Sequence, residues 1–180
     1  MARPSRRVLW SLAGICLAMA ASVVGWYVAN PFGTASLDPR ARLFGALSYR
    51  MASVAMEPAI PAGSLVMVDT KAYRDRGPAR NDVVAFIGSA SGGHAVYRVI
   101  GLPGDRVRVL EGALWVNDQP ASPPGTASVE PGFRGPYPVE NVQLAEHEYF
   151  LAGDNRDHAL DSRFQGPIHR NRLVGRVLEF

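Results

Sequence analysis

The sequence predicts a mainly β protein, a β-sheet or barrel domain preceded by one N-terminal transmembrane helix. Glycine and proline supply 18 and 14 of the 180 residues, against a combined background of roughly 12%, which favours short strands and many loops over a helical bundle. Short β-branched and aromatic segments separated by turn residues fill the region after residue 48. An uncharged apolar run over residues 8–29 comes before them.

The apolar run Val8–Ala29 has no charged side chain and is expected to be a membrane anchor. At ~1.5 Å per residue, a helix of this length crosses a hydrocarbon core of about 30 Å. Arg3, Arg6 and Arg7 precede it, which places the N-terminus in the cytoplasm and the following domain on the periplasmic or extracellular side. The chain is therefore expected in the inner (cytoplasmic) membrane as a single-pass protein.

Two other interpretations of the same run remain open. The tripeptide Ala18-Met19-Ala20 resembles a signal-peptide cleavage site, so the run could be removed in the mature protein. The apolar residues continue well past that tripeptide, which favours a retained anchor. A buried helix of a soluble protein is the third interpretation. Cys16, the single cysteine, lies within the run and excludes an internal disulfide.

The expected organisation has four parts: a basic cytoplasmic N-terminus (1–7), the transmembrane anchor (8–29), a linker (30–47) and a β domain (48–180). Asn30-Pro31-Phe32-Gly33 ends the anchor helix. Apolar and β-branched runs then predict strands over Ser48–Met51, Leu65–Asp69, Asp82–Ile87, His94–Leu102, Arg106–Leu110, Ala113–Val116, Val139–Leu144, Glu148–Ala152 and Leu173–Leu178.

Turn residues separate these strands. The glycines in 89–93 predict a hairpin because glycine supplies the positive φ that tight turns need. Glu111-Gly112 and Asn117-Asp118 predict two further turns. The proline- and glycine-rich stretch 120–138 predicts an irregular insert, 139–144 an edge strand, and 173–178 the strand that closes the sheet.

A dense polar stretch, Gly153–Arg163, directly follows the apolar strand that ends at Ala152. It holds three aspartates and two arginines within eleven residues. Such a stretch leaving a buried strand is typical of a loop that closes a cleft, where its charges pair with one another. A solvated turn is the alternative, because Gly-Asp-Asn is common in turns. We expect ion pairs of Asp154 with Arg156 and of Asp161 with Arg163.

Three stretches together resemble the conserved boxes of type I signal peptidases, the S26 serine endopeptidases. They are GDNRDHALDSR at 153–163, RVIGLPGD at 98–105 and SVAMEP at 53–58. The resemblance implies a signal-peptidase-like β domain on a membrane anchor. It also implies a hydrolase that uses a serine nucleophile and a neutral lysine base, with no cofactor and no metal.

The chain departs from that family at the residues that carry the chemistry. The nucleophile position falls on Ala55, the base position on Tyr97 and the lysine-orienting serine on Ala159. Alanine has no oxygen to form an acyl-enzyme, and a phenol with an ordinary pKa of about 10 is a poor base at neutral pH. The residues that still match are Ser53 on the oxyanion side and, in the polar stretch, Asp154, Arg156, Asp161, Ser162 and Arg163.

The three departures make sense together, because a serine that orients a lysine has no use once the lysine is gone. A single engineered knockout would explain only one of them. Displaced catalytic groups are the alternative, with Ser53 as nucleophile and His158 beside the polar stretch. His94 is expected on the strand face opposite Tyr97, and Lys71, the only lysine, lies in a charged loop. No His-x-x-x-His or similar spacing points to a metal.

The leading interpretation is therefore a non-catalytic, signal-peptidase-like membrane protein, a pseudoenzyme that binds extended peptides or assists the assembly and secretion of exported proteins. The alternative is an active signal peptidase with displaced catalytic groups, and a third is a structural subunit of a membrane complex. Expected partners are the membrane, signal-peptide-bearing polypeptides, and a dyad-complete paralogue or pilus or secretion components. The net charge of +3 suits anionic lipid rather than nucleic acid.

Overall fold

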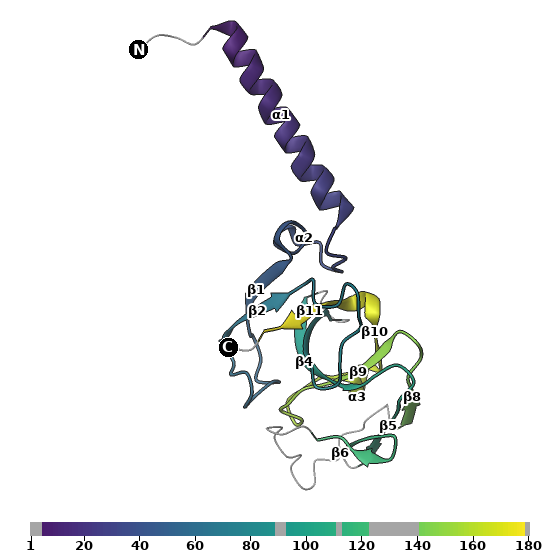
Figure 1. Cartoon of the computed structure of the whole chain (residues 1–180). Helices are drawn as coiled ribbons and strands as arrows, with labels where there is room; N and C mark the ends of the chain where they lie inside the picture. The colour runs from purple at the N-terminus through teal and green to yellow at the C-terminus, as the bar shows by residue number, and fades with distance from the viewer. Residues whose placement is uncertain (1–4, 89–92, 111–112, 123–140, 179–180) are drawn as a thin grey trace.

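The computed structural model describes residues 5–88, 93–110, 113–122 and 141–178, and it shows two parts (Figure 1). A long helix, α1 (Arg6–Ala29), projects from a β domain that contains the other elements. Among the described residues, α1 is the one helix long and apolar enough to cross a membrane. None of its residues is buried, which is consistent with the predicted anchor. The domain also contains three short helical turns, α2 (Pro39–Phe44), α3 (Ser162–Gln165) and η1 (Arg170–Arg172).

The larger sheet curls around the main core, and its described strands pair antiparallel (Figure 1). In spatial order they are β1 (Ala46–Arg50), β2 (Leu65–Asp69), β11 (Leu173–Val177), β3 (Val83–Ile87), β4 (His94–Gly101), β9 (Glu148–Ala152) and β10 (Ile168–His169). The late strand β11 thus lies between two early strands, β2 and β3.

A smaller sheet packs beside the larger one. Its described strands follow the order β7 (Gln119–Pro120), β6 (Ala113–Val116), β5 (Arg106–Leu110) and β8 (Asn141–Gln143). Successive side chains of a strand point to opposite faces, so β4 and β9 contribute to two cores. Val99 and Leu151 belong to the core of the larger sheet, whereas Ile100 and Phe150 belong to the core under the smaller one.

The structure confirms the mainly β prediction and the position of most strands. β8 is an edge strand, as expected, and Asn117 and Asp118 form a turn with φ of 50° and 64°. The strand predicted to close the sheet, 173–178, instead occupies an interior position. The predicted 89–93 hairpin tip, the Glu111-Gly112 turn and most of the 120–138 insert lie outside the described residues.

Helix α2 was not expected within the predicted linker. Its local signals are all present: the Asp38 side chain caps the helix by accepting from the Arg40 N–H at 2.8 Å, Pro39 begins it, and Gly45 ends it with φ of 71°. Helix α2 has only six residues, too few for a helical repeat of apolar residues to show in the sequence.

The linker is fastened to both the helix and the domain. The Thr34 hydroxyl donates to the Val174 carbonyl at 3.3 Å, and the Tyr27 hydroxyl donates to the Leu37 carbonyl at 2.8 Å. The guanidinium of Arg42 lies 5.0 Å from the centre of the Tyr27 ring. These contacts hold the β domain close to the C-terminal end of α1.

Candidate functional site

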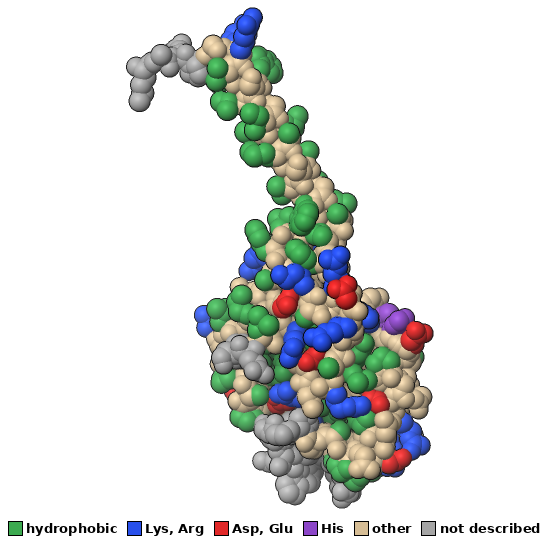
Figure 2. All heavy atoms as spheres, in the orientation of Figure 1, with side chains coloured by type: hydrophobic (Ala, Val, Ile, Leu, Met, Phe, Trp, Pro, Cys, Tyr) green, Lys and Arg blue, Asp and Glu red, His purple; other side chains and the backbone are tan. Residues whose placement is uncertain are grey.

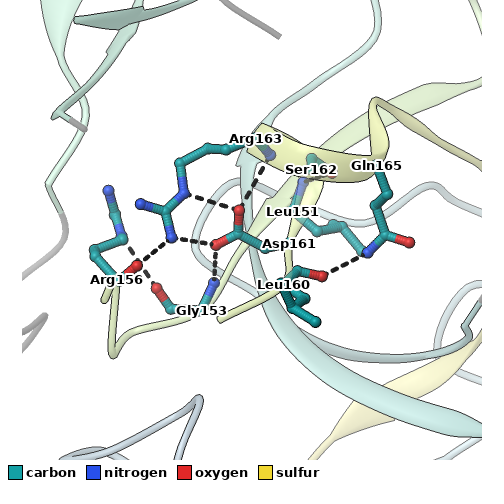
Figure 3. A network of polar contacts seen from close by, with 8 residues as sticks. All are labelled: Leu151, Gly153, Arg156, Leu160, Asp161, Ser162, Arg163 and Gln165. Carbon is teal, nitrogen blue, oxygen red and sulfur yellow. Dashed lines mark hydrogen bonds and ion pairs between the residues drawn. The ribbon is translucent and has the colours of Figure 1, made fainter. Parts of the chain in front are cut away.

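The polar stretch Gly153–Arg163 forms a buried network under the end of β9 (Figure 3). Asp161 and Arg163 are both fully buried, and the guanidinium of Arg163 makes two bonds to the carboxylate of Asp161, at 2.8 and 2.9 Å. Asp161 also accepts from the N–H of Arg163 at 3.1 Å, which caps helix α3. The predicted pair of Asp161 with Arg163 is confirmed.

Further bonds connect this pair to the strand that precedes it. The Gly153 N–H donates to Asp161 at 3.0 Å, and the Leu151 N–H donates to the Ser162 hydroxyl at 3.0 Å. Arg163 also donates to the carbonyl of Arg156. The carboxylate of Asp161 therefore joins the start of the loop to its end, because it accepts from both Gly153 and Arg163.

The predicted pair of Asp154 with Arg156 is wrong. Asp154 binds Arg98 on β4, with two bonds of 2.8 and 2.6 Å. The Arg156 Nε donates instead to the Gly153 carbonyl at 3.0 Å. Burial lowers the pKa of Arg156 to about 10, and the nearby charge of Arg163 acts in the same direction. Sequence spacing favoured the neighbour two residues away, but β4 brings Arg98 beside Asp154 from a distant part of the chain.

Arg98 is thus a site residue that the sequence interpretation missed. It follows Tyr97 directly, so the two side chains leave the strand on opposite sides. Its ion pair with Asp154 fixes the polar loop against β4, and its Nη1 also donates to the Asn81 carbonyl at 3.0 Å. Its place at the start of the RVIGLPGD stretch was the available signal.

The nucleophile position, Ala55, is buried, with 3% of its surface exposed. Its carbonyl accepts from the Asn155 N–H at 3.0 Å, which ties this turn to the polar loop. Alternation along a continuing strand would place Ser53 and Ala55 on one face, but β1 ends at Arg50 and both residues lie in the turn that follows. In this turn Ser53 is exposed to solvent, whereas Ala55 is buried.

Gly153 allows Ala55, the nucleophile position, and Ala159, the lysine-orienting position, to pack close together. A Cβ atom placed at Gly153 would lie 2.4 Å from the Cβ of Ala159 and 2.5 Å from the carbonyl oxygen of Ala55. Both residues therefore pack against the same glycine, and Ala159 is 3% exposed. Nothing larger than hydrogen fits at residue 153 in this arrangement.

Gly153→Ala is accordingly expected to lower the free energy of unfolding by about 1–3 kcal/mol, the usual cost of overpacking. Chemical denaturation of the full chain in detergent would measure it. Gly25→Ala is the matched control, because a Cβ at Gly25 meets no atom within 4 Å. A Gly153→Ala chain as stable as the parent would contradict the close packing of Ala55, Gly153 and Ala159.

The base position, Tyr97, is also buried, with 8% of its surface exposed. Burial raises the pKa of its phenol to about 12, and the charge of Asp161 adds to the rise, while Arg163 and a hydrogen bond with the Leu160 backbone oppose it. The phenol therefore holds its proton at neutral pH. Ala55, Tyr97 and Ala159 all belong to one buried core cluster.

The other candidates lie away from this cluster. His158 is exposed and bonds through Nδ1 to the Asn155 side chain at 3.1 Å. His94 is exposed whereas Tyr97 is buried, in agreement with the predicted opposite faces. Lys71 lies 5.6 Å from the Phe32 ring, near the end of α1. No group of three metal-binding side chains occurs among the described residues.

β1 and β4 face each other without being neighbours in the sheet. β1 pairs with β2, and the half of β4 from His94 to Tyr97 pairs with β3, because the β4–β9 pairing begins at Arg98. The rings of Tyr49 on β1 and His94 on β4 stack with centroids 5.7 Å apart. A strand edge of β1 and one of β4 therefore lie within side-chain reach of each other.

Together these features describe a curled antiparallel β domain with an N-terminal apolar helix and a polar loop closing over a buried turn. The family model "Signal peptidase, peptidase S26" matches residues 25–180. The chain belongs to this signal peptidase family.

Curated relatives agree with this membership. Signal peptidase I of Bacillus caldolyticus is 34% identical over 146 residues, covering 76% of this chain and 79% of that protein. Signal peptidase I V of Bacillus subtilis is 31% identical over 140 residues, covering 72% and 82%. The Synechocystis protein named Probable signal peptidase I-2 is 32% identical over 148 residues, or 76% of this chain, which spans 63% of that relative's length.

A solved structure with a similar sequence is the signal peptidase I of Enterococcus faecalis. It is 27% identical and has a TM-score of 0.47, covering 57% of this chain and 98% of that chain.

Proposed function

We propose that this protein is a non-catalytic member of the signal peptidase family that binds extended segments of exported polypeptides beside the membrane. The strongest support comes from the side chains at the three positions where the family has its catalytic serine, its lysine and the serine that orients the lysine. Ala55, Tyr97 and Ala159 lie together in the core, and they supply a methyl group, a protonated phenol and a second methyl group. This set offers no nucleophile and no neutral amine.

The facing edges of β1 and β4 are the binding site in this proposal. An extended peptide added to these edges could form main-chain hydrogen bonds with them. The intact polar loop supports the same idea, because Asp161, Arg163 and the Arg98–Asp154 pair keep the turn around Ala55 fixed. The fold would then serve recognition without cleavage.

A photo-crosslinking experiment tests this function. The full chain carries p-benzoyl-phenylalanine in place of Ser48 on β1, and a synthetic signal peptide is added. We expect a crosslinked product and no cleaved peptide by mass spectrometry. The same probe in place of Arg106, on the smaller sheet, is the matched control and should give no product. A peptide with N-methylated backbone amides should crosslink far less, because it lacks the donors that pair with a strand edge.

Other outcomes favour the other candidates. A cleaved peptide from the parent chain, lost in Ser53→Ala, would favour the active peptidase with a displaced nucleophile, for which the exposed Ser53 is the supporting observation. Neither crosslink nor cleavage would favour a structural subunit of a membrane complex, with partners such as a dyad-complete paralogue or pilus or secretion components.

The proposed topology has residues 1–7 in the cytoplasm, α1 across the inner membrane and the β domain on the outer side. Protease added to sealed spheroplasts is expected to digest the β domain, because the arginines before α1 favour the cytoplasmic side. Lysed spheroplasts provide the control for protease activity. Complete protection in intact spheroplasts would contradict the orientation, and a mature N-terminus near Ala21 would contradict the retained anchor.

A further inference from the structure

A pocket opens beside the end of α1, and none of its lining residues belongs to the polar stretch Gly153–Arg163 or is one of the three reactive positions. It has a volume of about 440 Å³, and its walls come from the linker, from the residue before β9 and from the β10–η1 segment: Gly33, Thr34, Ala35, His147, His169, Arg170, Asn171 and Leu173. None of these residues has a role in the function proposed above.

The linker wall of the pocket lies next to the membrane end of the helix. α1 ends at Ala29, and the Gly33 N–H donates to the Asn30 carbonyl at 2.9 Å. This bond closes a turn, which keeps the ends of the four residues within about 7 Å of each other. If α1 crosses the bilayer, Gly33 and Thr34 lie at the level of the lipid headgroups, because that layer begins where the hydrocarbon core ends.

The pocket presents hydrogen-bond donors. The Nδ1 atom of His169 accepts from the Asn171 N–H at 3.2 Å. A neutral imidazole has one donor and one acceptor nitrogen, so the proton of this ring is on Nε2. The ring of His147 lies against it, edge to face, with centroids 5.8 Å apart. Two exposed imidazoles side by side can both direct an N–H toward one acceptor.

Two arginines belong to the segment beside the pocket, Arg170 in its lining and Arg172 two residues further on. Arg170 donates to the Tyr73 carbonyl at 2.8 Å and Arg172 donates to the Ile87 carbonyl at 2.6 Å. These partners are neutral, so they leave both charges in place. Figure 2 shows basic side chains, with acidic ones among them, where the helix meets the domain. Glu148 lies opposite His169 across the β9–β10 pair, and Glu146 precedes His147 in the sequence, so two carboxylates lower the positive potential near the pocket.

We propose that this pocket binds the phosphate of an anionic phospholipid headgroup from the leaflet beside the end of α1. Phosphate oxygens accept from imidazole N–H groups, and the two arginines favour a net negative charge. The lipid's glycerol and acyl chains would extend toward the bilayer past the linker. The bound headgroup would fix the height and tilt of the β domain above the membrane. This role depends on α1 crossing the membrane and does not depend on peptide binding.

Native mass spectrometry of the full chain in detergent tests the proposal. Phosphatidylglycerol should be retained at least about tenfold more tightly than phosphatidylcholine, because both lipids carry the phosphate but only phosphatidylcholine brings a cation toward the arginines. The double variant His147→Ala/His169→Asn should lose about tenfold in phosphatidylglycerol retention, a difference that one charge-assisted bond is enough to give. Asparagine at residue 169 keeps an acceptor for the Asn171 N–H. Arg106→Gln, which removes a distant positive charge, is the matched control and should bind like the parent.

A second variant tests the proposal by a gain. Glu148→Gln removes the negative charge opposite His169, and it keeps an acceptor for the Ala145 N–H, which bonds Glu148 at 3.0 Å. Its retention of phosphatidylglycerol should be about threefold tighter, the usual size of one partly screened charge.

The opposite results would overturn the assignment. They are equal retention of the two lipids, an unchanged double variant, a Glu148→Gln chain that binds no tighter, or an equal loss in Arg106→Gln. Inorganic phosphate that displaces phosphatidylglycerol at equal concentration would also overturn it, because a free anion would then be the ligand. All these readouts are independent of peptide binding and cleavage.

Discussion

Asp161→Ala is expected to lower the free energy of unfolding by about 3–5 kcal/mol, the typical cost of breaking a truly buried ion pair. The substitution leaves the guanidinium of Arg163 buried without its carboxylate, since both side chains are fully inaccessible in the structure. It also removes the acceptor of the Gly153 N–H. Urea denaturation of the full chain in detergent, followed by circular dichroism, measures the change.

The matched control is Asp118→Ala. Asp118 pairs with Arg106 and Arg108, but its side chain is 54% exposed. Exposed pairs contribute less than about 1 kcal/mol, so this variant should unfold close to the parent. Equal small effects in both variants would show that the Asp161–Arg163 pair does not stabilise the domain.

The second large effect concerns activity. The parent chain is expected to give no detectable cleavage of a signal-peptide substrate, and Ser53→Ala should change nothing. Ala55→Ser alone should also stay inactive, because a serine hydroxyl without a neutral amine beside it is a weak nucleophile. Mass spectrometry of the peptide after prolonged incubation checks each chain, with an active signal peptidase as the positive control.

Recovery of activity is expected only from Ala55→Ser/Tyr97→Lys/Ala159→Ser, because residues that act as a unit are strongly non-additive. The site around Tyr97 is buried, and burial lowers the pKa of a lysine, as a neutral base requires. The result that contradicts the non-catalytic proposal is simpler. If the parent chain cleaves the substrate and Ser53→Ala abolishes the cleavage, Ser53 is the nucleophile.

Local patterns predicted the parts of the fold that depend on neighbouring residues. Alternation and turn residues placed β2, β5, β6 and β9 with the bounds that the structure has. The Asp161–Arg163 pair, two residues apart, was predicted for the same reason. These features are set by side chains that are close along the chain.

Long-range partners could not be predicted in this way. Arg98 pairs with Asp154 across 56 residues, and β11 lies between β2 and β3. Such contacts depend on how the sheet curls. The spacing of apolar and polar residues along the sequence does not reveal that curvature. The exposure of Ser53 could not be predicted locally either, because β1 ends before it and the path of the chain after a strand depends on tertiary contacts.

The interior position of β11 affects the order in which the larger sheet can fold. β1 and β2 connect to the rest of the larger sheet through β11. In the proposed topology the N-terminus stays in the cytoplasm, and the residues after α1 would leave a translocon in sequence order. β1, β2, β3 and β4 would then emerge long before the strand that joins them. The two halves must then wait as separate hairpin-like pieces with open edges, which are prone to wrong pairing. In this topology, folding of the sheet would finish only after residues 173–177 have left the channel.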